Sequence, residues 1–168
     1  YSFQLFMKRI LQSDRIVPPL LLGVAILSYG LFIPKLGLFG DDWPHLWVFH
    51  MFGLDGLDKL VAWDRPFSAW VYGLIAPIAG ENIWGYHLYL LLLRWAGAVI
   101  FYFIVKELLP KSQPVPLWTA LFFLIYPGFR QQPQPLEFIL HFTVLLFLLL
   151  SFYLMIKASQ NGKYWLIF

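Results

Sequence analysis

The sequence predicts an all-α, polytopic helical membrane protein. Of its 168 residues, 60% are hydrophobic, 20% are aromatic and only 12% are charged, which is about half the charged fraction of a typical soluble domain. Long apolar runs alternate with short polar segments that contain proline or glycine. The chain has no cysteine, which excludes a disulfide framework, a cysteine-based zinc site and a thiol nucleophile.

The apolar runs predict four transmembrane helices. We expect these spans at residues 16–34, 83–105, 115–126 and 138–156. About 20 apolar residues in a helix cover the hydrocarbon layer, so the third run needs its flanking residues to cross. The chain starts at Tyr1, and residues 164–168 begin another apolar run. We therefore expect residues 1–168 to be one transmembrane domain, the N-terminal part of a longer protein that enters a fifth span.

The distribution of charge predicts the orientation in the membrane. Four spans place both chain ends on one side, and that side carries seven Lys and Arg against two acidic residues, whereas the other carries four against seven. The positive-inside rule then makes both ends cytoplasmic and places residues 35–82 outside, in a multi-pass protein of the plasma membrane. The net charge of +3 follows from this topology. Because no basic stripe with interleaved aromatic residues is present, we expect membrane lipids as partners and no nucleic acid.

The outer loop, residues 35–82, holds most of the groups that can do chemistry. Two apolar stretches within it, residues 43–54 and 66–80, predict helices that lie in the membrane interface. We expect an aromatic belt at the outer interface from five tryptophans: Trp43, Trp47, Trp63, Trp70 and Trp84.

Asp41 and Asp42 stand directly beyond the outer end of the first span. Two adjacent carboxylates can act as a general base, bind a divalent metal or anchor substrate hydroxyls. Alternatively, Asp42 caps the helix that starts at Trp43 and Pro44, because an acidic N-cap suits the helix dipole. Arg65 has two interpretations as well, since it can bind a phosphate or form a simple ion pair with its neighbour Asp64.

Four further polar residues lie at or within the predicted spans. Arg94 falls in the middle of the second span, where a buried charge usually has a function or a partner inside the bundle. His87 and His141 lie near the outer ends of two spans and could ligate a haem or a chlorophyll magnesium, although no motif accompanies them and packing histidines are the simpler interpretation. Glu137 stands at the outer mouth of the fourth span, in the same compartment as Asp41 and Asp42.

This order of features resembles the amino-terminal part of the GT-C membrane glycosyltransferases, especially the branch of protein mannosyltransferases and aminoarabinose transferases. The resemblance covers most of the chain: a cytoplasmic start, one span, a long outer loop that opens with Asp41 and Asp42, and a second interfacial helix introduced by Asp64-Arg65-Pro66-Phe67. Closely spaced spans and Glu137 follow. The family commonly has Asp-Glu where this chain has Asp-Asp.

The resemblance implies an enzyme that moves a sugar from a polyprenyl-phosphate carrier to an acceptor on the outer face. It implies that Asp41 is the general base or the acceptor-binding group, with Asp42 as its partner and Glu137 as a further catalytic acid. Arg65 would lie near the lipid phosphate. We also expect His45 and Arg94 to bind substrate.

A protein of another class, a non-catalytic membrane subunit, is the alternative. Such a subunit would use its aromatic surface to pack in a larger photosynthetic or respiratory complex, and an occupied His87 or His141 would favour it. An outer cavity that holds Asp41, Arg65 and Glu137 together would favour the enzyme. A transporter is a third class, but the sequence has no inverted repeat or paired broken helices.

Overall fold

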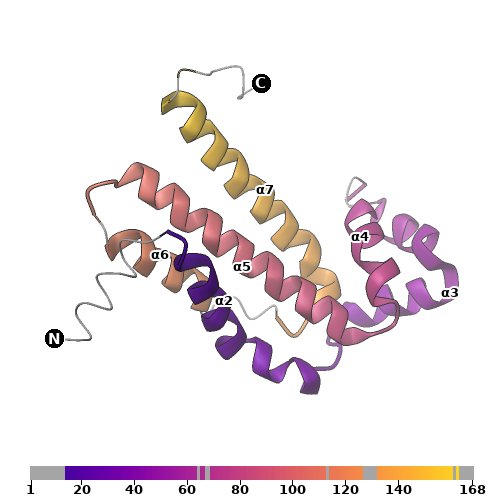
Figure 1. The fold of residues 1–168 in the computed structure, drawn as a ribbon. Coiled ribbons are helices and arrows are strands. Elements are labelled where there is room, and N and C mark those ends of the chain that lie inside the picture. The colour runs from indigo at the N-terminus through magenta and orange to yellow at the C-terminus, as the bar shows by residue number, and fades with distance from the viewer. Residues whose placement is uncertain are drawn as a thin grey trace. The chain divides into compact units, whose positions relative to one another are not determined.

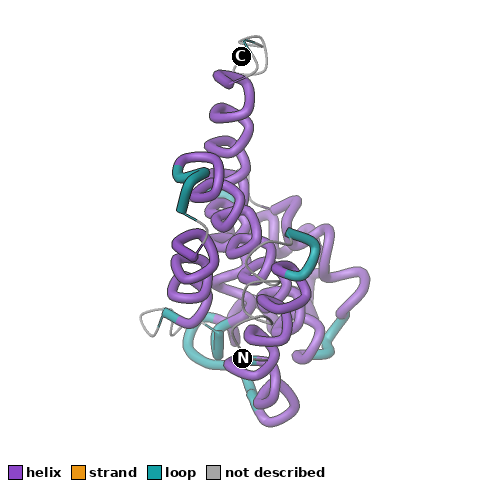
Figure 2. The backbone as a smooth tube through the Cα atoms, turned by 60° about the vertical axis from the view of Figure 1, so that its left-hand side comes forward, coloured by secondary structure: helices purple, strands orange, loops and turns teal. Residues whose placement is uncertain are grey.

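The computed structural model describes residues 14–63, 65–66, 69–112, 114–126, 132–160 and 162, and this part of the chain is all-α, as predicted (Figures 1 and 2). It contains six α-helices and one 3-10 helix, with no strand among the described residues. In order they are α2 (Val17–Ser28), η1 (Gly30–Lys35), α3 (Asp42–Val61), α4 (Ala69–Ala79), α5 (Ile83–Leu108), α6 (Pro114–Ile125) and α7 (Pro135–Gln160).

Three segments of the described chain are long and apolar enough to cross a membrane. They are Val17–Lys35, which joins α2 to η1, and the helices α5 and α7. By length and composition this indicates a multi-pass membrane protein, and three of the four predicted spans are found as segments able to cross. The remaining run forms α6, whose 12 residues rise only about 18 Å and are too short to cross alone. Residues 164–168, the predicted start of a further span, lie outside the described residues.

The chain divides into two compact units, and each is described by itself. The first unit comprises the described residues of Tyr1–Ser28, Arg94–Pro127 and Leu145–Phe168. Within it, the Trp95 indole N–H donates to the Pro18 carbonyl at 2.9 Å. Asp14 accepts hydrogen bonds from Lys106 and Tyr102, and the Lys106 ammonium holds the pKa of Asp14 below its usual value of 3.8. These contacts stabilise the end of the unit from which α2 starts.

The second unit, Tyr29–Leu93 and Gly128–Val144, is organised around His87. This side chain is fully buried, with Nδ1 3.0 Å from the Gln132 carbonyl oxygen and Nε2 3.2 Å from that of Gly37. The Gln132 amide in turn donates to the His87 carbonyl at 3.1 Å. The contacts join three segments far apart in the sequence: the loop before α3, the first turn of α5 and the approach to α7.

A turn at Gly53 divides α3 into two helical segments. Gly53 has φ 65° and ψ −154°, a combination that is essentially restricted to glycine because a Cβ would clash with the backbone. The second segment packs closely on the first, since a Cβ added at Gly56 would lie 2.9 Å from Val48 Cγ1. The predicted helix at 43–54 is therefore only the first segment of α3. The second predicted interfacial helix, at 66–80, is found as α4, which packs on α3.

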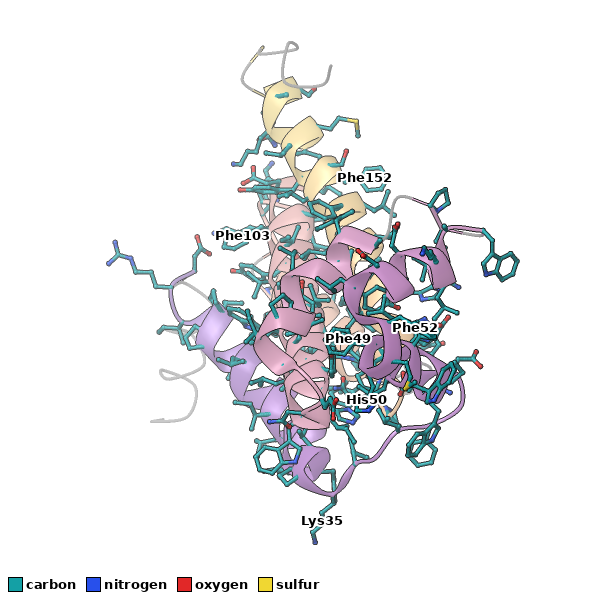
Figure 3. All side chains as sticks on the ribbon, turned by 90° about the vertical axis from the view of Figure 1, so that its right-hand side faces the viewer. Lys35, Phe49, His50, Phe52, Phe103 and Phe152 are labelled. Carbon is teal, nitrogen blue, oxygen red and sulfur yellow. The ribbon has the colours of Figure 1, made fainter. Side chains whose placement is uncertain are left out.

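The tryptophans of the second unit are exposed. The relative exposure of Trp43, Trp47, Trp63, Trp70 and Trp84 ranges from 50% to 84%. Many aromatic side chains project from α3, where Figure 3 labels Phe49, His50 and Phe52. Exposed indole rings suit a lipid–water interface. The aromatic belt stays a prediction, and these five exposed tryptophans are the side chains that would form it.

Candidate functional site

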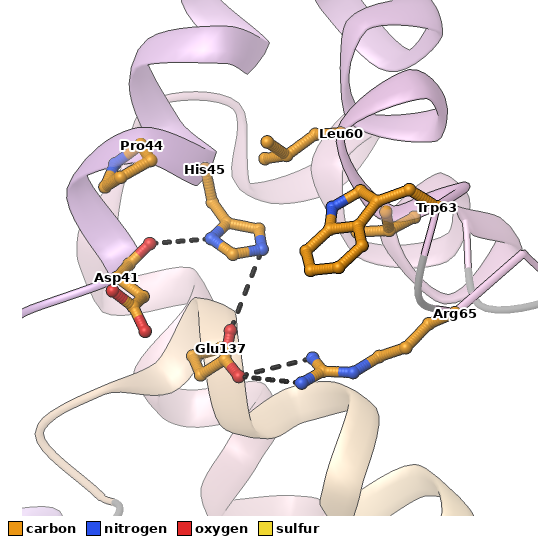
Figure 4. Close-up of a pocket in the computed structure, with 8 residues that line it drawn as sticks. Asp41, Pro44, His45, Leu60, Trp63, Arg65 and Glu137 are labelled. Carbon is orange, nitrogen blue, oxygen red and sulfur yellow. Dashed lines mark hydrogen bonds and ion pairs between the residues drawn. The ribbon is translucent and has the colours of Figure 1, made fainter.

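A pocket of about 240 Å³ in the second unit is lined by four of the eight candidate site residues (Figure 4). Its walls come from the start of α3, the end of α3, the segment that follows it and the first turn of α7. The lining residues are Asp41, Pro44, His45, Leu60, Val61, Trp63, Arg65 and Glu137. Asp41, Arg65 and Glu137 thus share one cavity, which is the arrangement that the enzyme interpretation requires.

A close approach at Gly40 brings the start of α3 to the start of α7. Gly40 has φ 52°, and a Cβ added there would lie 2.7 Å from Gln134 Nε2. Only glycine combines this backbone conformation with such proximity at no steric cost. Because Asp41 follows Gly40, and Glu137 stands three residues after Gln134, this approach explains why the two acidic residues meet.

Glu137 is at the centre of the polar contacts in the pocket. Both terminal nitrogens of Arg65 donate to Glu137 Oε1, each at 3.2 Å. The other carboxylate oxygen, Oε2, lies 3.8 Å from His45 Nε2. The side chains of Glu137 and Arg65 are 16% and 35% exposed, so the ion pair is partly shielded from water and is stronger than a surface pair. Arg65 pairs here across 72 residues, and its predicted partner Asp64 lies outside the described residues.

His45 is held in one orientation by its surroundings. Its Nδ1 donates to the Asp41 carbonyl oxygen at 2.6 Å, and because a carbonyl only accepts, Nδ1 carries the hydrogen. Its ring lies 5.6 Å from the ring of Tyr72, a fully buried residue whose hydroxyl donates to the Leu136 carbonyl at 3.0 Å. Tyr72 was not among the residues predicted from the sequence, although its hydroxyl is a rare polar group in the apolar helix α4.

Asp42 caps a different helix from the one that the sequence predicted. The N-cap of α3 is Asp41, which makes no side-chain capping hydrogen bond, so the prediction that Asp42 caps its own helix is wrong. Instead, Asp42 Oδ1 accepts the backbone N–H of Glu137 at 3.0 Å and thereby caps α7. Asp42 is fully buried and does not line the pocket. Burial raises the pKa of Asp42 to about 6, against the lowering by the backbone amides of Glu137, Phe39 and Leu136.

This raised pKa predicts how Asp42 contributes to stability. The folded state binds the Asp42 proton more tightly than the unfolded state does. The unfolding free energy should therefore fall as pH rises from about 4 to about 6, and it should stay level at higher pH. A rise from 3.8 to about 6 corresponds to roughly 3 kcal/mol. The Asp42→Asn variant keeps an acceptor but no charge, so its unfolding should lack this pH dependence, and at pH 7.5 it should be more stable than the wild type. Thermal unfolding in detergent at several pH values measures both effects.

Asp42→Ala is the matched variant for the capping role. It removes the charge but also the acceptor for the Glu137 N–H, which should cost about 1 kcal/mol relative to Asp42→Asn. Equal stability of the alanine and asparagine variants would contradict the cap. Identical pH dependence in the wild type and in Asp42→Asn would contradict the raised pKa.

The other candidate residues lie outside this pocket. Arg94 is fully buried in α5 and belongs to the first unit. Both ring nitrogens of His87 lie at backbone carbonyl oxygens, which leaves neither of them directed at a metal. His141 is exposed on α7, with its Nδ1 3.3 Å from the Glu137 carbonyl oxygen. Among the described residues, no group of three or more His, Asp or Glu side chains is placed to hold a metal ion.

Comparison with known proteins gave no relative for this chain. No family, no curated protein and no solved structure matches it.

Proposed function

We propose that this protein is a GT-C-like glycosyltransferase, which moves a sugar from a polyprenyl-phosphate carrier to an acceptor on the outer face of the membrane. The observation that carries the proposal is the single pocket lined by Asp41, Arg65 and Glu137. In this proposal the Asp41 carboxylate meets the acceptor hydroxyl, and the Arg65 guanidinium binds the phosphate that leaves. A cation at that position stabilises the negative charge that develops on the leaving oxygen.

The position of Arg65 also suits a donor that has a polar sugar at one end and an apolar prenyl chain at the other. Arg65 lines a second pocket, of about 230 Å³, together with Leu140, His141 and Val144 of α7. Leu140 and Val144 lie one turn apart on the helix, so they give this second pocket an apolar wall. A phosphate at Arg65 would place the sugar in the polar pocket and the prenyl chain along α7. The donor proposed here therefore has a polar part and an apolar part that match the two pockets.

The proposed topology places this site outside the cytoplasm. The predicted spans assign Asp14, Lys106, Glu107 and Lys157 to one side of the membrane, and in the first unit they form two ion pairs, Lys106 with Asp14 and Lys157 with Glu107. The pocket residues are all assigned to the opposite side and lie together in the second unit. Each grouping agrees with the predicted topology, in which the positive-inside rule makes the N-terminus cytoplasmic and places residues 35–82 outside, at the plasma membrane. A fourth crossing would need α6 together with neighbouring residues.

The decisive experiment compares the full-length wild type with the Asp41→Asn variant. Polyprenyl-phosphate mannose and polyprenyl-phosphate glucose are supplied to inverted and right-side-out vesicles of the native membrane, whose own hydroxyl-bearing components serve as the acceptor, and the release of polyprenyl phosphate is measured. The wild type should consume donor at the outer face, and Asp41→Asn should be slower by about 100-fold, because a misplaced acceptor costs about that much. Asp55→Asn, which changes an exposed acidic residue of α3 that does not line the pocket, is the matched control and should keep full activity.

Two outcomes would overturn the proposal. Full transfer activity in Asp41→Asn would remove Asp41 from the reaction. A wild-type protein that consumes no donor, and that purifies firmly bound in a pigment- or cofactor-bearing assembly, would instead establish the non-catalytic subunit.

A further inference from the structure

The pocket contains an imidazole whose two nitrogens have different surroundings. His45 Nδ1 carries its hydrogen toward the Asp41 carbonyl oxygen, so Nε2 is the nitrogen that can gain or lose a proton. This Nε2 faces Glu137 Oε2 at 3.8 Å, which is longer than a direct hydrogen bond. With Nδ1 protonated, a neutral His45 presents a lone pair to the pocket. The ring is thus fixed in the tautomer that a general base needs.

The two oxygens of Glu137 divide their contacts between the Arg65 guanidinium and the His45 imidazole. Oε1 accepts both hydrogen bonds from Arg65, and Oε2 faces His45. If Nε2 takes a proton, the imidazolium that forms lies next to a carboxylate in a partly shielded site, where the attraction is stronger than in water. Glu137 is therefore placed to stabilise the protonated state of His45 while it keeps Arg65 in position.

From this geometry we infer that His45 is the catalytic base of the transferase proposed above, on which this inference rests, and that Asp41 instead positions the acceptor. The acceptor hydroxyl oxygen attacks the anomeric carbon of the sugar and forms the new C–O bond. The bond from that carbon to the phosphate oxygen breaks, and its electron pair stays on the phosphate, which Arg65 binds. The hydroxyl proton moves to His45 Nε2, so atoms and charge balance.

Several titratable and charged groups surround His45, and a proton on its ring would interact with them. The titratable and charged groups that face it are Glu137 from α7, Arg65 before α4, Tyr72 of α4, and the neighbouring Asp41 and Asp42. Tyr72 packs against the ring and bonds to the backbone of α7. Glu137 Oε2, at 3.8 Å from Nε2, is therefore the carboxylate oxygen that faces the nitrogen where the proton would arrive.

The test measures the pH profile of kcat and the KM for acceptor in the full-length protein, for the wild type, His45→Gln and Asp41→Asn. A base must be unprotonated, so wild-type kcat should fall as pH is lowered. His45→Gln should lower kcat by about 100- to 1,000-fold and should lack this fall, with polyprenyl phosphate still bound in native mass spectrometry. Asp41→Asn should keep the fall in kcat and raise the KM for acceptor.

Controls separate a chemical role from a structural one. His50→Gln alters a second histidine of α3, exposed and paired with Glu81, and should leave both kcat and its pH profile unchanged. If His45→Gln unfolds, His45→Ala with added imidazole replaces it, and recovery of activity by imidazole supports the base. If kcat of His45→Gln still fell at low pH as it does in the wild type, the role of His45 would be overturned. A folded His45→Ala protein that recovers no activity with imidazole would overturn it as well. A wild type without any donor turnover would overturn both this inference and the proposed function.

Discussion

Replacing Arg65 by glutamine is expected to weaken the binding of polyprenyl phosphate by about 30-fold, or about 2 kcal/mol. The guanidinium binds Glu137 from one side and lines both the polar and the apolar pocket, so it is placed where a lipid phosphate would meet a cation. Glutamine keeps much of the length of the side chain but removes the charge. Native mass spectrometry of the full-length protein with added polyprenyl phosphate measures the change.

Two other variants sharpen this test. Arg65→Lys keeps the charge but loses the planar fork, so its affinity should fall between those of the wild type and Arg65→Gln. Lys59→Gln removes another exposed cation of the predicted outer loop, one that does not line the pocket, and should bind as the wild type does. Equal losses in Lys59→Gln and Arg65→Gln would show only a general effect of charge and would contradict a specific phosphate contact.

The largest loss of stability is expected from His87→Ala, at about 3–5 kcal/mol. This change leaves a cavity in the second unit. It also removes the side chain that lies between the carbonyl oxygens of Gly37 and Gln132, and a buried polar group without a partner costs about 1–3 kcal/mol. The midpoint of thermal unfolding, followed by circular dichroism in detergent, should fall clearly relative to the wild type.

The chain offers His141→Ala as the matched control for His87→Ala. His141 lies on a spanning helix too, but it is exposed and its hydrogen bond is to its own helix. Its replacement should change the unfolding free energy by no more than about 0.5 kcal/mol. Similar unfolding midpoints for the two variants would contradict the role of His87 as the residue that joins three segments.

The sequence was sufficient to predict which parts of the chain are helical. Of the six residues proposed for catalysis or substrate binding, four line one pocket, whereas Asp42 and Arg94 do not. Apolar runs and prolines located α5 and α7 closely, because long hydrophobic helices are specified locally. The grouping of Asp41, Arg65 and Glu137 on one side of the membrane followed from the topology, since four predicted spans place all three in the same compartment. Composition and order along the chain therefore carry the coarse arrangement of the pocket.

Other features depend on contacts between distant segments and could not be read from local patterns. Asp42 precedes a helix and matches a local cap, yet it caps α7, which begins more than 90 residues later. In the sequence Tyr72 is one of several aromatic residues in an apolar run. Only its contacts with His45 and Leu136 distinguish it. The run at 115–126 was predicted as a span with the help of its flanking residues, but α6 itself includes only 12 residues and is too short to cross alone.

The turn at Gly53 has a mechanical consequence for the pocket. Asp41 and His45 lie before this turn in α3, and Leu60 and Val61 lie after it. Two walls of the cavity therefore belong to the two segments of α3, which are joined by the single turn at Gly53. The distance between these two walls therefore depends on the torsion angles of Gly53 and on the close packing of Gly56 against Val48.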